Sequence, residues 1–354
     1  MAILSTVLLA GLLAQTPVPP ESAVPPTATP VVLERVFRVG QVSQYEVVGQ
    51  LNGEQRFADP NGGLRIDTFL PFQQRLAYRF TSEVVSKKAD GIAEVRYRRP
   101  TMTISAGPNE EGDMETSIEK LNLDLRIQLS PINEMLSVAS WAAPTKPSTG
   151  GKAPAKWIYS MRPAQAMPGG GAPFVSEIIR LALFQGSLDS SVDLSPRLPY
   201  EEVKAGDTWK RTVGYSPQAL PGKDGKSAVQ RLDYVFTYLG AVTENGVKTD
   251  RVRADLKLDT DAAPFINQQL GLKPADSPIE RYPLKLNASI EWRLDPITRA
   301  TLRADAKSTG EFSIKIRNVE RPLVEMKLNG TTTMRPIATA KAPPLPSRPR
   351  PRKR

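Results

Sequence analysis

The alternation of apolar and polar residues along this chain predicts a protein built mainly of β-strands. Apolar residues occupy every second position in two segments of similar sequence. They are Leu121, Leu123, Leu125, Ile127 and Leu129 in the first segment, and Leu286, Ala288, Ile290, Trp292 and Leu294 in the second. Because successive side chains of a strand point to opposite faces, this pattern is typical of antiparallel sheet with one buried face and one wet face.

The two segments belong to a longer unit that occurs twice. The matched pairs are 75–81 with 231–237, 120–132 with 285–297 and, more weakly, 37–40 with 203–206. They follow the same order along the chain at similar separations, which indicates a duplication. We therefore predict two related antiparallel β lobes, each a half-barrel or part of a sandwich. A single large sheet completed jointly by both repeats is the alternative.

Dipeptides in which Asp or Asn precedes Gly or Pro mark the predicted turns. Asp90-Gly91 and Asn245-Gly246 are expected to close hairpins, because type I′ turns require residues that tolerate positive φ. Asp295-Pro296 predicts another turn, and Asn329-Gly330 a further one. Separate strands are expected at 302–306, 312–316 and 324–328.

One strongly apolar helix is predicted between the lobes, at 173–185. Pro173 stands at its start and Gly186 just past its end, and Glu177 and Arg180 are its only charged residues. A helix this apolar is expected to be buried against a sheet, where it would cover a concave face. A shorter helix is predicted at 264–270.

Proline-rich segments separate these parts. The predicted organisation is a signal peptide at 1–14, a disordered Pro-rich spacer at 15–31, a first lobe at 32–140, a linker with the apolar helix at 141–197, a second lobe at 198–335 and a disordered basic tail at 336–354. The apolar run near the N-terminus is shorter than the ~20 residues of a membrane span and suits a signal peptide. A buried N-terminal strand or helix is the alternative.

The amino-acid composition excludes several kinds of catalytic and metal sites. The 354 residues include no Cys and no His, which excludes Ser-His-Asp and Cys-His catalysis and the usual zinc sites. We expect no enzyme activity, no catalytic residue, no metal and no cofactor. Two carboxylates could still hydrolyse a glycan, and this remains a third hypothesis.

The formal net charge is +10, and most of this excess lies at the C-terminal end. The last cationic residues are Arg348, Arg350, Arg352, Lys353 and Arg354. Because the body of the chain is nearly neutral, nucleic acid is not the expected partner. For an exported protein, these residues predict contact with an anionic surface of the cell envelope.

Aromatic and aliphatic side chains are the candidate ligand-binding residues. Those predicted to line a cavity are Tyr78, Phe80, Tyr97, Phe174, Ile178, Tyr234, Phe236 and Trp292. The alternative is that the same residues press together in a dry core. Sequence pattern does not separate these two interpretations.

The segment Val203–Trp209, preceded by Leu198-Pro199, resembles a sequence motif of uncharacterised secreted β-rich bacterial proteins. The turn at 294–298 resembles one as well. The chain also resembles the lipoprotein-carrier type of periplasmic half-barrel. That resemblance implies an incomplete antiparallel barrel closed by helices, and it assigns no functional residue.

These observations predict an exported, non-enzymatic protein of the periplasm or cell envelope that binds an apolar or lipid-like ligand in a concave β-sheet. The alternative is a structural or protein-interaction module of the envelope with a filled core.

Overall fold

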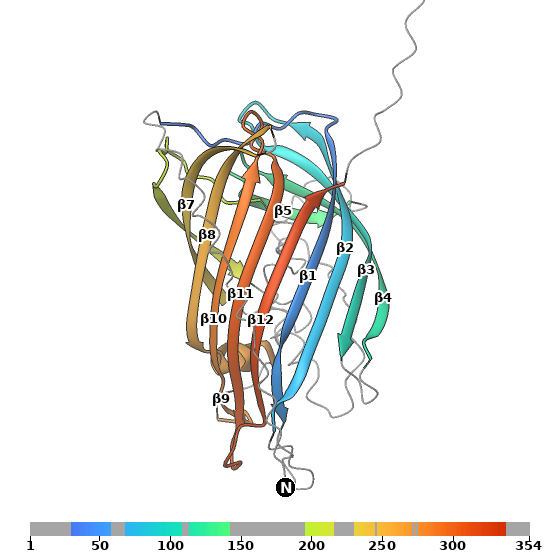
Figure 1. The fold of residues 1–354 in the computed structure, drawn as a ribbon, viewed down its shortest axis with the longest axis vertical. Coiled ribbons are helices and arrows are strands. Elements are labelled where there is room, and N and C mark those ends of the chain that lie inside the picture. The colour runs from blue at the N-terminus through green and yellow to red at the C-terminus, as the bar shows by residue number, and fades with distance from the viewer. Residues whose placement is uncertain are drawn as a thin grey trace, which may run out of the picture.

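The computed structural model describes residues 30–57, 68–107, 113–141, 195–215, 230–244, 246–270, 273 and 275–337. Within them the protein is mainly β, as predicted, and forms one twelve-stranded antiparallel sheet that is not closed (Figure 1). The predicted signal peptide, the helix at 173–185 and the basic tail lie outside the described residues. The shorter predicted helix is confirmed as α3 (Ala263–Leu270).

The strands follow the chain order closely. They are β1 (Val42–Phe57), β2 (Leu70–Lys87), β3 (Ala93–Gly107), β4 (Glu115–Leu129), β5 (Met135–Ser140), β6 (Thr208–Tyr215), β7 (Gln230–Glu244), β8 (Val247–Asp261), β9 (Ile279–Arg281), β10 (Pro283–Leu294), β11 (Thr301–Ile316) and β12 (Val324–Pro336). Their order in the sheet is β5-β4-β3-β2-β1-β12-β11-β10-β8-β7-β6, with β9 paired to β11. We call β1–β5 the first half and β6–β12 the second half.

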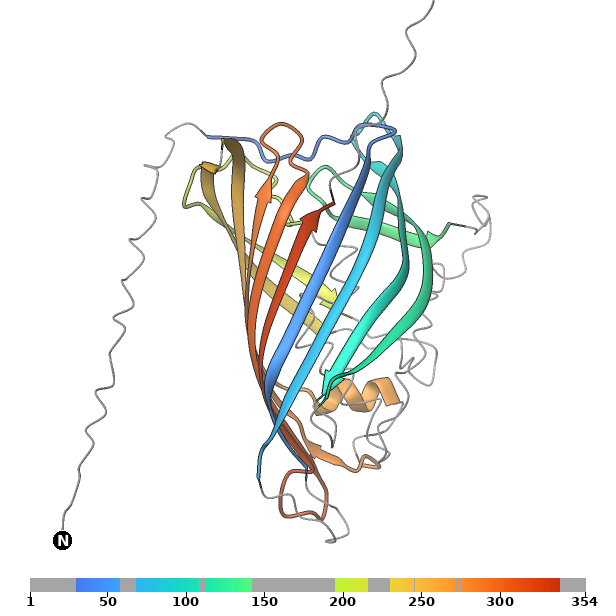
Figure 2. The same cartoon turned by 45° about the vertical axis from the view of Figure 1, so that its right-hand side comes forward.

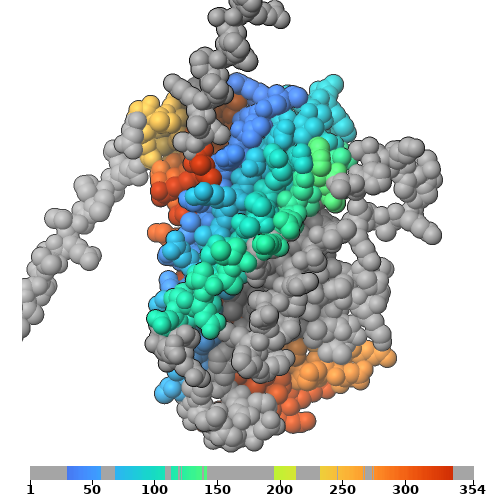
Figure 3. All heavy atoms as spheres, turned by 90° about the vertical axis from the view of Figure 1, so that its right-hand side faces the viewer, coloured from blue at the N-terminus to red at the C-terminus, as the bar shows by residue number. Residues whose placement is uncertain are grey.

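Pairing of β1 with β12 joins the two halves into one sheet. The sheet curves so that β4 and β7 lie on opposite sides of it (Figure 1). A view from the first half shows β1, β2, β3 and β4 side by side in that order (Figure 3). Of the alternatives that the sequence left open, the structure shows the single sheet completed by both repeats.

The repeated sequences occupy corresponding places in the two halves. Residues 75–81 lie in β2 and 231–237 in β7, while the other long match starts in β4 and in β10. Gly40 and Gly206, at the ends of the weakest match, both have positive φ, 82° and 95°. Gly40 N–H donates to Val84 O at 2.8 Å, and Gly206 N–H donates to Tyr238 O at 2.7 Å. The duplication is therefore visible in backbone contacts as well as in sequence.

The segments that precede β1 and β6 cross at one end of the sheet, where 30–40 runs over the top (Figure 2). Val31 and Val203 form an antiparallel bridge between the two segments. Asn133 Nδ2 of the first half donates to Pro196 O at 3.0 Å. Reciprocally, Arg299 Nη2 of the second half donates to Val32 O at 3.4 Å. Each half thus holds the leading segment of the other.

One face of the sheet is buried and lines the inside of the curve. In β10 the buried residues are Leu284, Leu286, Ala288, Ile290, Trp292 and Leu294, as the period of two predicts. The outer face carries cross-strand ion pairs, among them Arg79–Glu46 at 2.9 Å, Arg96–Asp124 at 2.7 Å and Arg251–Glu291 at 2.8 Å. The apolar face therefore points inward and the charged face points outward.

Two of the predicted glycine turns are confirmed and one is wrong. Gly91 and Gly246 have φ values of 84° and 77° at the β2–β3 and β7–β8 hairpins. Asn329-Gly330, in contrast, lies inside β12, where Gly330 pairs with Leu51 of β1. A Cβ on Gly330 would collide with Ser308 Oγ, so the glycine permits close strand packing. The strands expected at 302–306 and 312–316 are likewise one continuous strand, β11.

Candidate ligand site on the concave face

Each half carries a stack of three aromatic rings on the inside of the sheet. In the first half, ring centroids of Tyr45 and Phe80 are 5.0 Å apart, and those of Phe80 and Tyr97 are 5.1 Å apart. Tyr45 and Phe80 are direct cross-strand neighbours on β1 and β2. Stacked rings at these spacings add attraction beyond the area that they bury.

The second half repeats this arrangement with larger rings. Trp209 and Phe236 are cross-strand neighbours on β6 and β7, with centroids 5.6 Å apart. Trp292 of β10 stacks on the other side of Phe236 at 6.0 Å. Ala254 of β8 pairs with Phe236, and its small side chain lets a ring from the next strand reach across.

The structure places the described site residues in one continuous core, in a group of rings in each half. Tyr78, Phe80 and Tyr97 are buried in the first group, and Tyr234, Phe236 and Trp292 in the second. Phe174 and Ile178 lie outside the described residues. Whether these rings line a ligand cavity stays a prediction.

A small cavity adjoins the first ring stack. Its lining includes Arg35, Tyr45, Phe80, Tyr97 and Thr301, and its volume is about 40 Å³. A water molecule takes up roughly 30 Å³ in the liquid, so this cavity has room for about one water molecule. A chain-like ligand would have to displace side chains or chain segments to enter here.

Arg99 is the most unusual residue on the concave face. Alternation along β3 buries Ala93, Val95, Tyr97 and Arg99 on one side. Pairing with β4 shifts register between Arg99 and Thr101, next to Pro100. A β-bulge of this kind re-aims side chains and is common near functional sites. The guanidinium is therefore directed into the apolar interior by the strand itself.

No hydrogen bond compensates for the burial of Arg99. Its side chain is 0% exposed, and within the described part of the chain none of its three nitrogens has a hydrogen-bond partner. Its Cζ lies 4.5 Å from the ring centroid of Tyr78, a cation–π contact. Such a contact satisfies none of the five N–H donors of a guanidinium. Burying a charge without a hydrogen-bond partner costs several kcal/mol, so the burial of Arg99 is unfavourable by itself.

A second arginine, Arg35, lies beside the same cluster. Arg35 Nη1 donates to Ser195 Oγ at 2.9 Å, and the guanidinium lies 5.0 Å from the Phe37 ring centroid. Burial lowers the pKa of Arg35, while the interaction with Tyr45 acts in the opposite direction. Neither arginine pairs with a carboxylate among the described residues. The first half therefore concentrates uncompensated positive charge in an apolar setting.

The second half also buries charge, but there the charge is paired. Asp250 is 4% exposed, forms an ion pair with Arg299 and accepts a hydrogen bond from the Tyr238 hydroxyl at 2.7 Å. Burial and this hydrogen bond raise the pKa of Tyr238. The position facing Phe236, which is the counterpart of Phe80, holds the uncharged Ala254. The buried charge of Asp250 is therefore compensated within the second half.

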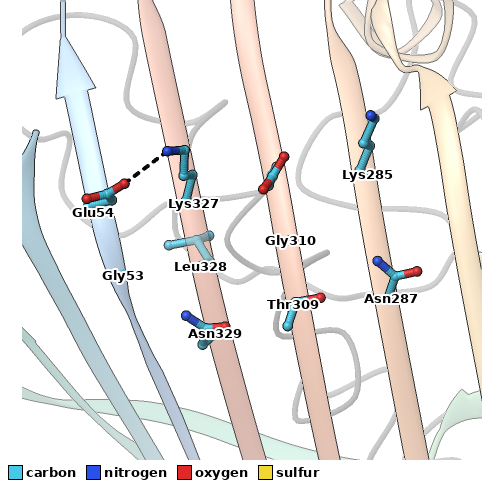
Figure 4. A pocket seen from close by; sticks show the side chains of 10 residues that line it. Gly53, Glu54, Lys285, Asn287, Thr309, Gly310, Lys327, Leu328 and Asn329 are labelled. Atoms are coloured by element: carbon cyan, nitrogen blue, oxygen red, sulfur yellow. Dashed lines mark ion pairs between the residues drawn. The ribbon is translucent and has the colours of Figure 1, made fainter.

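The outer face offers a different kind of hollow, a polar groove across β1, β12, β11 and β10 (Figure 4). Its walls carry Lys285, Asn287 and Thr309, and Glu54 pairs with Lys327 at 3.2 Å. Charges of both signs are present and the groove is open. It holds no buried charge that lacks a partner, so we place the candidate site on the concave face.

Sequence reasoning did not single out Arg99. A usable signal was present, because the alternation through Ala93, Val95 and Tyr97 continues to position 99. Pro100 directly after it also suggests a bulge.

The described residues contain no group of three or more acidic side chains that could hold a metal ion. Nor does any helix within them have the length and apolar character needed to cross a membrane.

No known protein family matches the sequence, and no curated protein matches it either. Among solved structures, a lipovitellin described under lipid–protein interactions is similar, with 10% identity over 87% of this chain and 26% of that chain and a TM-score of 0.39. This chain thus spans about a quarter of the length of lipovitellin.

Two further solved structures are similar at lower TM-scores. DynF of the dynemicin biosynthesis pathway of Micromonospora chersina has 9% identity over 86% of this chain and 85% of that chain, with a TM-score of 0.19. OprB of Pseudomonas putida has 9% identity over 84% of this chain and 93% of that chain, with a TM-score of 0.17. At such values, the function has to be argued from this chain's own residues.

Proposed function

We propose that this protein is an exported, non-enzymatic binding protein that holds an apolar or lipid-like ligand against the concave face of its sheet. The observation that carries the proposal is the contiguous apolar surface on that face. It extends through both halves as one cluster of buried side chains. A single sheet with one apolar face needs a covering for that face, since exposed apolar area is unfavourable in water.

The charged character of the outer face also favours binding of the ligand on the concave face. It carries rows of ion pairs such as Arg293–Glu244 at 2.7 Å and Arg303–Asp305. A face of this kind is suited to water. An apolar ligand is therefore expected only inside the curve.

The absence of His and Cys supports a role without catalysis. Export agrees with the N-terminal sequence, and the cationic residues from Arg348 to Arg354 are suited to an anionic envelope surface. Binding to such a surface should weaken as salt rises and should be lost when 336–354 is deleted.

One observation favours the second candidate, a structural or protein-interaction module. The aromatic rings next to the first-half cavity pack on one another and leave about 40 Å³. A core that stays filled would bind partners through its outer surface and take up no apolar ligand.

Uptake of a neutral dye separates the two candidates. Protein stripped of lipid on a hydrophobic resin is titrated with N-phenyl-1-naphthylamine, whose fluorescence rises in apolar surroundings. The binding function predicts a saturable rise that oleyl alcohol reverses. A rise that does not saturate, or none at all, would leave the filled-core module.

A matched pair of variants locates the dye. Phe80→Leu alters the buried ring stack, whereas Phe69→Leu alters a ring that contacts Arg56 and Lys327 on the outer face. Dye affinity should fall in the first variant and stay unchanged in the second. Equal affinities in both variants would place the dye elsewhere.

A further inference from the structure

We infer that the ligand carries an anionic head group, a carboxylate or a phosphate, which pairs with Arg99 in the first half of the sheet. This inference rests on the proposed function and adds the chemistry of the head group. It starts from the guanidinium of Arg99, which is fully buried and has no hydrogen-bond partner on any nitrogen among the residues that the structure describes.

The geometry of a guanidinium specifies the missing partner. Its N–H donors form a planar fork that matches two oxygens of a carboxylate or phosphate. Tyr78 contacts the guanidinium through its ring, at 4.5 Å from Cζ, and this contact leaves the donors unused. In surroundings of low polarity, a charge-assisted pair is stronger than in water. An incoming anion would remove the cost of the buried charge.

Arg35 strengthens the preference for an anion. It lies at the small cavity together with Tyr97, which precedes Arg99 on the same face of β3. Residues two apart on a strand are separated by roughly 7 Å. Arg35 has Ser195 as its hydrogen-bond acceptor and no carboxylate among the described residues. Both arginines thus add positive potential to one apolar region.

The rest of the region fits an apolar chain and not a small ion. The Tyr78 ring contacts Arg99, and Phe80, Tyr97 and Met102 are buried on the same two strands, β2 and β3. A free inorganic anion would satisfy the guanidinium but gain nothing from this surface. An anionic amphiphile uses both features.

The second half serves as an internal contrast. There, the residue that pairs with Phe236 is Ala254, and the nearby buried carboxylate of Asp250 is already paired with Arg299. Among the described residues of that half, no arginine has all three side-chain nitrogens buried without a hydrogen-bond partner, as Arg99 does. The head group is therefore assigned to the first half.

The test compares matched ligands that differ only in charge. Isothermal titration of delipidated protein uses oleate against oleyl alcohol for the carboxylate, and lysophosphatidate against monoolein for the phosphate. Wild type should prefer at least one anion over its neutral partner by about tenfold or more, the gain expected of a charge-assisted hydrogen bond. Whichever anion shows the preference identifies the head group.

Three variants assign the preference to Arg99. Arg99→Met should remove it while neutral ligands still bind, and Arg99→Lys should keep part of it as a point charge. Arg96→Met is the matched control, because Arg96 lies on the same strand but on the outer face, paired with Asp124. The control should bind like wild type.

Different outcomes would overturn the head-group inference alone, or the proposed binding function as well. If wild type binds neutral and anionic partners equally, the inference fails and the binding function stands. If no ligand binds, both fail. Inorganic phosphate that protects wild type from thermal unfolding as well as lysophosphatidate does would show a small-ion site and overturn the amphiphile. A loss of stability in ligand-free Arg99→Met would reveal an anionic partner within the chain and also overturn it.

Discussion

The two halves of the sheet bury charge in different ways, although their strands and turns correspond. In the second half Asp250, Arg299 and Tyr238 form a closed set in which each polar group has a partner. In the first half Arg99 is as deeply buried, and among the described residues it has the ring of Tyr78 beside it but no hydrogen-bond acceptor. The closed set stabilises the fold, whereas the open one costs stability unless a ligand completes it. Under the proposed function, the second half stabilises the structure and the first half binds the ligand.

The ring stacks support the same contrast. Trp209, Phe236 and Trp292 fill the second half because Ala254 leaves room between β7 and β10. In the first half, the rings of Tyr45, Phe80 and Tyr97 adjoin a cavity.

The largest expected effect comes from breaking the closed set. Asp250→Asn should lower the free energy of unfolding by about 3–5 kcal/mol, because it leaves Arg299 buried without its counter-ion. Urea unfolding measures the loss. Asp255→Asn is the control, since Asp255 pairs with Arg253 on the exposed face and its loss should cost under about 1 kcal/mol. Equal losses would contradict the distinction between buried and exposed pairs.

Removing the charge of Arg99 should raise the free energy of unfolding, whereas breaking the closed set lowers it. Arg99→Met is expected to raise the free energy of unfolding of ligand-free protein by about 1–3 kcal/mol, because an apolar side chain suits the site better than an uncompensated cation. The same urea titration measures the gain. A decrease would show that the first half, like the second, has a closed set.

The corresponding turns after β4 and β10 should differ in their response to acid. Asp295 accepts hydrogen bonds from Ile297 N–H at 3.0 Å and from the N–H and hydroxyl of Thr298. In the first half, Ser130 Oγ accepts one from Glu134 N–H at 3.0 Å. Burial alone would raise the pKa of Asp295, but these hydrogen bonds outweigh it and hold the pKa below its usual range.

A lowered pKa in the folded state means stability that is present above the unfolded pKa, about 3.9, and is lost as pH falls through the folded value. Asp295→Ala should therefore cost about 1–2 kcal/mol at neutral pH and progressively less below pH ~4. Ser130→Ala should cost about 1 kcal/mol at every pH, because serine does not titrate. Parallel pH profiles for the two variants would be the contrary result.

The smallest effect is expected at the outer face of β3. Arg96→Met removes the pair with Asp124, whose side chain is 37% exposed, and should cost under about 1 kcal/mol. Thermal unfolding at low and high salt measures it, with a smaller difference at high salt. A loss as large as that of Asp250→Asn would contradict the assignment of faces.

Much of the fold could be predicted because it depends on local pattern. The period of two in 285–294 places Trp292 and its neighbours inside, and the repeated sequences do lie in corresponding strands. Asn245-Gly246 and Asn329-Gly330 look alike in sequence, yet Gly246 lies between β7 and β8, whereas Gly330 lies inside β12. The difference is set by pairing partners distant in the chain, which local sequence does not contain.

For the same reason, the buried rings of the candidate site could be predicted from the sequence, but the surroundings of Arg99 could not. The rings of Phe80 and Phe236 could be predicted as buried from strand periodicity. That Arg99 has no partner, while Arg299 finds Asp250, depends on which strands become neighbours. The joining of both repeats through β1 and β12 is likewise a long-range event.

Mass spectrometry of what the protein carries when purified from its native source tests the central claim most directly. Wild-type protein and the Arg99→Met variant are purified in parallel without detergent, extracted with organic solvent and analysed for amphiphiles. The account predicts a near-stoichiometric fatty acid or phospholipid-type anion with wild type and a clear reduction of it in Arg99→Met. Extracts without any amphiphile, or with the same neutral lipids from both proteins, would contradict it.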